Sequence, residues 1–129
     1  MDGAPIRADS PSASDATVSF AAALSATQEW QAWEAAAVLV HSDPSAQQAS
    51  AAYDERLQAL RLNLMLQAAS AEEKADLERL REAVFAVPSV RAYAEAETAL
   101  KALCAATSQR LSQAIGLDFA ASCATGCCS

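Results

Sequence analysis

Apolar residues recur at intervals of three and four along most of the chain, the spacing that places them on one face of a helix. The segment containing Trp30, Trp33, Ala37 and Val40 is the clearest example, because these side chains form a single stripe that we expect to be buried. The pattern predicts five helices, which cover approximately residues 16–24, 27–41, 44–69, 71–87 and 90–115.

Polar residues at the ends of these segments match known helix-capping signals. Ser25–Gln28 and Ser70–Glu73 both have the form of a capping box, in which two side chains satisfy free amides at a helix start. Asp43 followed by Pro44 is a further start signal, since aspartate caps a helix and proline suits its first position. Gly116 is expected to end the last helix, because glycine commonly follows a helix C-terminus.

Pro88 interrupts the apolar pattern in a way that leaves two alternatives. Either Ser89 caps a new helix, or one helix continues through a kink at the proline. The chain has only three glycines, and none lies between positions 4 and 115, so few turns that need a positive φ are available. The expected fold is all-α, an antiparallel helical hairpin or bundle of four to five helices joined by short loops.

The predicted helix over residues 44–69 carries more apolar side chains than one stripe requires. Its apolar residues occupy one face and the flank beside it: Tyr53, Leu57, Leu60 and Leu64 on the face, with Leu62 and Leu66 beside them. This width predicts burial on two sides. A single chain of these proportions would leave part of that surface uncovered, which predicts self-association or a protein partner.

The charge balance argues against nucleic acid and membrane surfaces as direct partners. The formal net charge is −7, with 9 basic against 16 acidic residues, whereas phosphate binding depends on lysine and arginine. The longest apolar run, Ala35–Val40, is far shorter than the roughly 20 residues that span a bilayer. Residues 1–15 contain no apolar signal segment and are expected to form a disordered leader, which favours a cytoplasmic protein.

Three of the four cysteines, Cys123, Cys127 and Cys128, fall within six positions in the sequence. Thiolates this close can surround zinc, copper(I) or an iron–sulfur centre. An iron–sulfur cluster usually has four cysteine ligands, so the segment is one ligand short. The missing ligand is Cys104, a group other than cysteine, or a cysteine of another chain. Free thiols with no metal are the simpler alternative.

The remaining candidates for chemistry favour structural roles. Cys104 lies among leucines of the last predicted helix, so packing in the core is its favoured role, and it is only a weak fourth ligand. His41, the only histidine, is expected at a helix C-terminus, where a partial positive charge is favourable. No nucleotide-binding loop, nucleophile elbow or paired-histidine motif occurs in the sequence, so we expect no enzymatic activity.

Several of these segments, in this order, resemble the YlbF/YmcA family of small bacterial helical regulators. They are the capped aromatic segment Ser25–Trp33, the Asp43-Pro44 helix start, and residues 77–97 with the pattern LxxLxxAVFxVPxVxxYxxAE, followed by an amphipathic helix to Gly116. The cysteine-rich C-terminal segment makes the chain most similar to the YlbF branch. The resemblance extends over roughly residues 16–129.

The resemblance implies a non-enzymatic regulatory subunit. It further implies assembly with YmcA-like and YaaT-like proteins into a complex that holds iron–sulfur clusters, of the 4Fe-4S type. In this family such a complex modulates RNase Y-dependent mRNA maturation and developmental decisions. By position, Cys123, Cys127 and Cys128 would be the cluster ligands, with the cluster shared with a partner chain.

The resulting domain organisation is a leader over residues 1–15, a helical YlbF/YmcA-like domain over 16–116 and a flexible cysteine-rich tail over 117–129. Two other hypotheses are consistent with the residues. One is a structural helical homo-oligomer whose tail is incidental or binds zinc. The other, a thiol oxidoreductase, is disfavoured because nothing near the tail would lower a thiol pKa.

Overall fold

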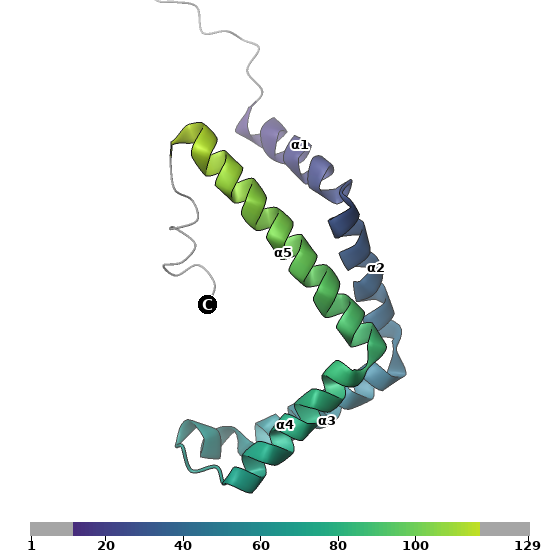
Figure 1. Ribbon diagram of the computed structural model, residues 1–129, viewed down its shortest axis with the longest axis vertical. Helices are drawn as coiled ribbons and strands as arrows, with labels where there is room; N and C mark the ends of the chain where they lie inside the picture. Colours follow the sequence, from purple (N-terminus) through teal and green to yellow (C-terminus); the bar gives the residue numbers. More distant parts are fainter. Residues whose placement is uncertain (1–11, 117–129) are drawn as a thin grey trace, which may run out of the picture.

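The computed structural model describes residues 12–116, and all five helices in this range were expected. They are α1 (Ala13–Ser25), α2 (Gln28–Ser42), α3 (Pro44–Met65), α4 (Ala71–Ala86) and α5 (Pro88–Ile115). Figure 1 shows two arms that meet at an angle: α1 and α2 follow one another beside α5, while α3 lies beside α4. The described part of the chain is thus a long antiparallel helical hairpin, bent once, which confirms the all-α prediction.

The bend arises from two prolines at the same level of the hairpin. Pro44 and Pro88 each occupy the first turn of a helix, and each is preceded by a residue in an extended conformation. The residues concerned are Asp43 with ψ 111° and Val87 with ψ 124°. Proline sterically disfavours the helical conformation for the residue before it, so the helical path is interrupted on both sides of the hairpin at this level. We call this place the elbow.

A hydrogen bond joins the two breaks across the elbow. The Ser89 hydroxyl donates to Oδ2 of Asp43 at 2.5 Å, while Oδ1 of the same carboxylate accepts from the backbone amide of Ser45 at 2.9 Å. Asp43 therefore caps α3, as expected, and ties the start of α5 to it. Neither alternative at Pro88 is confirmed: α4 ends at Ala86, so no single kinked helix continues, and α5 begins at Pro88 with Val87 as an N-cap that makes no side-chain hydrogen bond, while Ser89 is engaged with Asp43.

This hydrogen bond makes the elbow sensitive to acid. The Ser89 hydroxyl, and secondly the Ser45 amide, lower the pKa of Asp43 below its usual value of 3.8. A carboxylate with a lowered folded-state pKa contributes stability above the unfolded pKa of roughly 4, and this stability is lost as the pH falls through the folded pKa. We expect the thermal midpoint of the wild type to fall more between about pH 4 and pH 2 than that of Asp43→Asn, which retains a capping group without the charge. Parallel midpoint curves would contradict this role.

The start positions of the other helices test the capping predictions. Ser70 and Glu73 form the expected capping box of α4. The capping box expected at Ser25 is wrong: α1 continues through Ser25, and the side chain of Thr27 accepts from the Trp30 amide to cap α2 instead. α1 begins at Ala13, three positions before the expected start, so the helical part extends into the predicted leader. Residues 1–11 and 117–129 lie outside the described part of the chain.

The helix α3 ends four residues earlier than the sequence pattern predicts. Gln67 adopts a left-handed conformation with φ 54°, which breaks the helix. The amides of Ala68 and Ala69 both donate to the carbonyl of Asn63, at 2.7 and 3.2 Å, and so satisfy the end of α3. Because the chain turns early, Ala69 is buried in the turn between α3 and α4.

Few side chains are fully buried in this two-layer arrangement. Within residues 12–116 the buried apolar residues are Ala36, Ala46, Leu60 and Ala69. Trp30 and Trp33, expected to be buried, are half-buried. The prediction that α3 is buried on two sides is wrong for the single chain, since Leu62 and Leu66 are 66% and 68% exposed. Each helix has one neighbouring helix along most of its length, so only one of its faces is covered.

Candidate functional site

The C-terminal end of α5 is the part of the described structure closest in sequence to the predicted cysteine ligands. Gly116 ends α5 in the left-handed conformation, with φ 70° and ψ 18°, as expected for a glycine at this position. Cys123, Cys127 and Cys128 lie outside the described residues. Cys104 lies three helical turns before Gly116 and is exposed, so the expectation that it packs in the core is wrong.

The described residues do not by themselves form a metal site. Between residues 12 and 116, no three histidine, cysteine, aspartate or glutamate side chains gather closely enough to bind a metal ion. His41 lies in the last turn of α2, as expected, and its Nδ1 is 2.6 Å from the carbonyl oxygen of Ala37. The described part of the chain therefore offers Cys104 as its one accessible thiol, and any other thiolate ligand must come from the tail or from a partner.

An aromatic cluster joins α2 to α5 in the first arm. The ring centroids of Trp30 and Trp33 are 5.4 Å apart, and those of Trp33 and Tyr93 are 6.3 Å apart, both in tilted arrangements. Tilted aromatic pairs at these distances stabilise packing. The three side chains are half-buried between the two helices, which agrees with a structural role.

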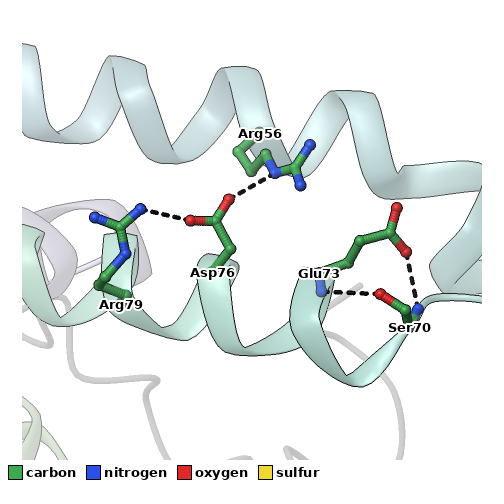
Figure 2. Close-up of polar contacts among 5 residues, drawn as sticks. All are labelled: Arg56, Ser70, Glu73, Asp76 and Arg79. Atoms are coloured by element: carbon green, nitrogen blue, oxygen red, sulfur yellow. Dashed lines mark hydrogen bonds and ion pairs between the residues drawn. The ribbon is translucent and has the colours of Figure 1, made fainter.

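The most organised group of charged side chains lies between α3 and α4 (Figure 2). Asp76 of α4 accepts from Nε of Arg56 on α3 at 2.9 Å and from Nη2 of Arg79 at 2.5 Å. The hydrogen bond from Arg79, followed by that from Arg56, lowers the pKa of Asp76 below its usual value. The pairing of Asp76 with Arg56 was not predicted from the sequence. The twenty positions that separate Arg56 from Asp76 carry no local signal of this contact.

This charged group has no features of a catalytic site. Arg56, Asp76 and Arg79 border a shallow depression with Ser70 and Glu73, and the last two residues are engaged in the capping box of α4 (Figure 2). The Asp76 carboxylate is neutralised by two guanidinium groups, and among residues 12–116 no cysteine or histidine lines the depression to act as nucleophile or base. Partly exposed ion pairs of this kind contribute little to stability. Only the Arg56–Asp76 pair joins α3 to α4, since Asp76 and Arg79 lie on the same helix.

Exposed apolar side chains are the more informative surface feature. Most of them lie towards the two ends of the hairpin, while Val38, Leu39 and Phe85 lie near the elbow. At the α3–α4 turn, Leu62, Met65 and Leu66 are 66%, 73% and 68% exposed, and we call this group the tip. At the opposite end, which α1 and the last turns of α5 form (Figure 1), the open end consists of three half-exposed residues, Phe20, Leu111 and Ile115. The sequence pattern placed Leu62 and Leu66 beside an apolar stripe but did not identify which stripes lack a neighbour.

Comparison with known proteins identifies the family. The family described as control of competence regulator ComK, YlbF/YmcA, matches residues 14–116, which is most of the chain. The chain belongs to the YlbF/YmcA family. The match ends at Gly116 and so covers the five helices, but not the cysteine-rich segment. No curated protein and no solved structure gives a significant match.

Membership of the YlbF/YmcA family agrees with the geometry of the described residues. The family is one of regulators, and the described part of the helical hairpin exposes large apolar side chains of the kind that protein partners cover. None of the helices within residues 12–116 is long and apolar enough to cross a membrane. The features left for function are therefore the tip, the open end and Cys104.

Proposed function

We propose that this protein is a non-enzymatic regulatory subunit that binds partner proteins through its exposed apolar surfaces. The partners are YmcA-like and YaaT-like proteins, and the assembly modulates RNase Y-dependent mRNA maturation and developmental decisions. The observation that carries the proposal is the tip: three large apolar side chains, each about two-thirds exposed or more, in a chain that belongs to a family of regulators.

The tip has the properties of a docking surface. Leu62, Met65 and Leu66 are spaced by three and four positions, so they project from adjacent turns at the end of α3. Three such side chains expose an apolar area on the order of a few hundred Å², which in soluble proteins marks an interaction site. Methionine and leucine on one helical surface suit an apolar groove or helix of a partner, because methionine adapts to irregular contacts.

The second part of the proposal concerns the cysteines. Cys123, Cys127 and Cys128 would hold an iron–sulfur cluster of the 4Fe-4S type, for which four thiolates are the usual ligand set. Cys104 is an accessible fourth thiol. It lies roughly 18 Å along the helix axis from Gly116. The seven residues from Gly116 to Cys123 span up to roughly 24 Å, so the distance allows all four thiols to meet. A cysteine of a partner chain is the alternative fourth ligand.

The bound cluster would supply redox-sensitive cross-linking of chain segments. The cysteine thiolates of this chain would bind it, and the helical arms would position them. Zinc on the same thiolates would supply a purely structural link, because zinc has no redox chemistry. The donor set accepts either metal, so the distinction depends on metal analysis.

Co-purification from cells that co-express the YmcA-like and YaaT-like proteins tests partner binding. The variant Leu62→Ser/Met65→Ser/Leu66→Ser removes the apolar surface of the tip, and we expect recovery of the partners to fall tenfold or more. Val38→Ser/Leu39→Ser is the matched control, because these residues on α2 are similarly exposed at 66% and 61%. Circular dichroism should show equal helix content in both variants.

Equal partner recovery from both variants would contradict a role of the tip. If the tip variant instead loses self-association while partner recovery is unchanged, the structural homo-oligomer replaces the proposed regulator. Anaerobic purification with the partners, followed by iron and zinc quantification, tests the cluster separately. Colourless, iron-free protein from that preparation would overturn the iron–sulfur part, and stoichiometric zinc would identify the alternative.

A further inference from the structure

The helix α1 has almost no tertiary support among the described residues. It packs against α2, the next helix in the chain, and makes at most marginal contact with any other helix. It is 13 residues long and carries Phe20 and Val18 at 49% and 68% exposure. Helices shorter than roughly 12–15 residues are only marginally stable in water without packing. A helix of this length with exposed apolar side chains needs a covering group.

The apolar side chains in the last turns of α5 are also left uncovered by the other described helices. Leu111 lies eleven positions after the half-buried Leu100 and so occupies nearly the same helical face. The start of α1 and the end of α5 lie at the same end of the molecule (Figure 1), the two helices make at most marginal contact, and Leu111 and Ile115 are 49% and 52% exposed. The uncovered parts of α1 and α5 belong to the same end of the molecule, so one segment of chain can cover both.

Gly116 has a backbone conformation that commonly turns a chain back along its helix. A helix that ends in a left-handed glycine reverses the direction of the chain, and the residue after the glycine commonly contacts an apolar residue in the preceding turn. The residue after Gly116 is Leu117, and the apolar residue one turn back is Leu111. A Cβ at Gly116 would meet no atom within 4 Å, so its backbone conformation, and not a lack of space, requires glycine.

We propose that residues 117–121 fold back onto the open end and cover Phe20, Leu111 and Ile115. This segment has the sequence Leu-Asp-Phe-Ala-Ala, which is apolar at four of five positions. Five residues extend up to roughly 17 Å, which exceeds the roughly 8–10 Å that separates the axes of two packed helices. The proposal needs no bound metal, so it is independent of the proposed iron–sulfur cluster.

Covalent connection favours this occupant over a second copy or a separate protein. A segment attached through a short flexible link has an effective concentration in the millimolar range at its docking site. A second copy carries the same net charge of −7 and would approach against electrostatic repulsion. The docked segment would also keep the following cysteines beside α5, the helix that carries Cys104.

Amide hydrogen exchange of the full chain, reduced and free of metal, tests this docking. In Leu117→Ser/Phe119→Ser we expect the amides of α1 and of residues 108–116 to exchange about tenfold faster or more than in the wild type. Residues 44–65 in the other arm should exchange at unchanged rates. Ala124→Ser is the control in the same tail, and it should leave α1 unchanged, because it lies beyond the docked segment.

Two results would overturn the docking of the tail. One is an unchanged exchange rate of α1 in the double variant. The other is protection of α1 that rises with protein concentration between low and high micromolar, which would assign the surface to a second copy. Both substituted residues lie after the last described helix. If the double variant and the wild type have equal circular dichroism, their helix content is the same, and a faster exchange of α1 then reports the loss of docking. The exchange experiment uses metal-free protein, so its outcome does not depend on whether the tail binds an iron–sulfur cluster.

Discussion

Leu60→Ala is expected to lower the free energy of unfolding by about 2–5 kcal/mol, the range typical of a buried leucine replaced by alanine. Leu60 lies on α3 at 3% exposure, and the other buried side chains within residues 12–116 are alanines. No other large apolar side chain of the described chain is covered as fully. Since small domains have only about 5–15 kcal/mol of net stability, this loss is a large fraction of the total.

Urea unfolding of the isolated chain, followed by circular dichroism, measures the effect. Leu62→Ala is a matched control two positions along the same helix, because it removes the same atoms from a side chain that is 66% exposed. Its expected change is within about 0.5 kcal/mol, as for other surface positions. Equal losses in the two variants would mean that Leu62 is covered in solution by a second copy, or that Leu60 does not anchor α3 to α4.

The helix boundaries that local chemistry determines were predicted well from the sequence. The breaks at Pro44 and Pro88 follow from the steric restriction that proline places on the preceding residue. The capping box at Ser70 also uses only neighbouring residues. The prediction at Ser25 was wrong because Thr27 offers a competing cap two positions later, and the choice between them depends on where α1 ends. Similar local signals gave no indication of the left-handed Gln67 that ends α3.

Burial was predicted less well, because periodicity identifies an apolar face without showing what covers it. The stripes of α3 and α5 are real, yet Leu62 and Leu111 on them are exposed in the bent hairpin. The same reason explains the error at Cys104: its apolar neighbours in the sequence lie on a helix that has only one covered side. A bundle with a third layer would have buried these residues, and the sequence does not reveal how many layers form.

The contacts that hold the hairpin together across long sequence separations were not predicted. The hydrogen bond from Ser89 to Asp43 spans 46 positions, and the ion pair of Arg56 with Asp76 spans 20. Both depend on which helices lie side by side, which periodicity does not determine. The candidate site was predicted only in outline: the structure assigns Cys104 to an exposed position on α5, while the ligand role of the tail cysteines stays a prediction.

Replacement of Cys123, Cys127 and Cys128 by serine is expected to reduce bound iron at least tenfold in protein purified anaerobically with its partners. Serine is a far poorer ligand than a thiolate for iron–sulfur clusters, which are held by cysteine. The three residues lie after α5, so the helix content should match that of the wild type. Ala124→Ser, within the same segment, is the control and should retain iron.

The Cys104→Ser variant then distinguishes an intrachain ligand set from a shared one. Because Cys104 is exposed, the substitution should leave stability unchanged, so a loss of iron would report a lost ligand. We expect its iron content to fall severalfold, since a cluster with three thiolates is less firmly held. If Cys104→Ser retains full iron while the triple variant loses it, the fourth ligand comes from a partner chain. If the triple variant retains iron, the tail does not hold the cluster, and the helical arms would serve partner binding alone.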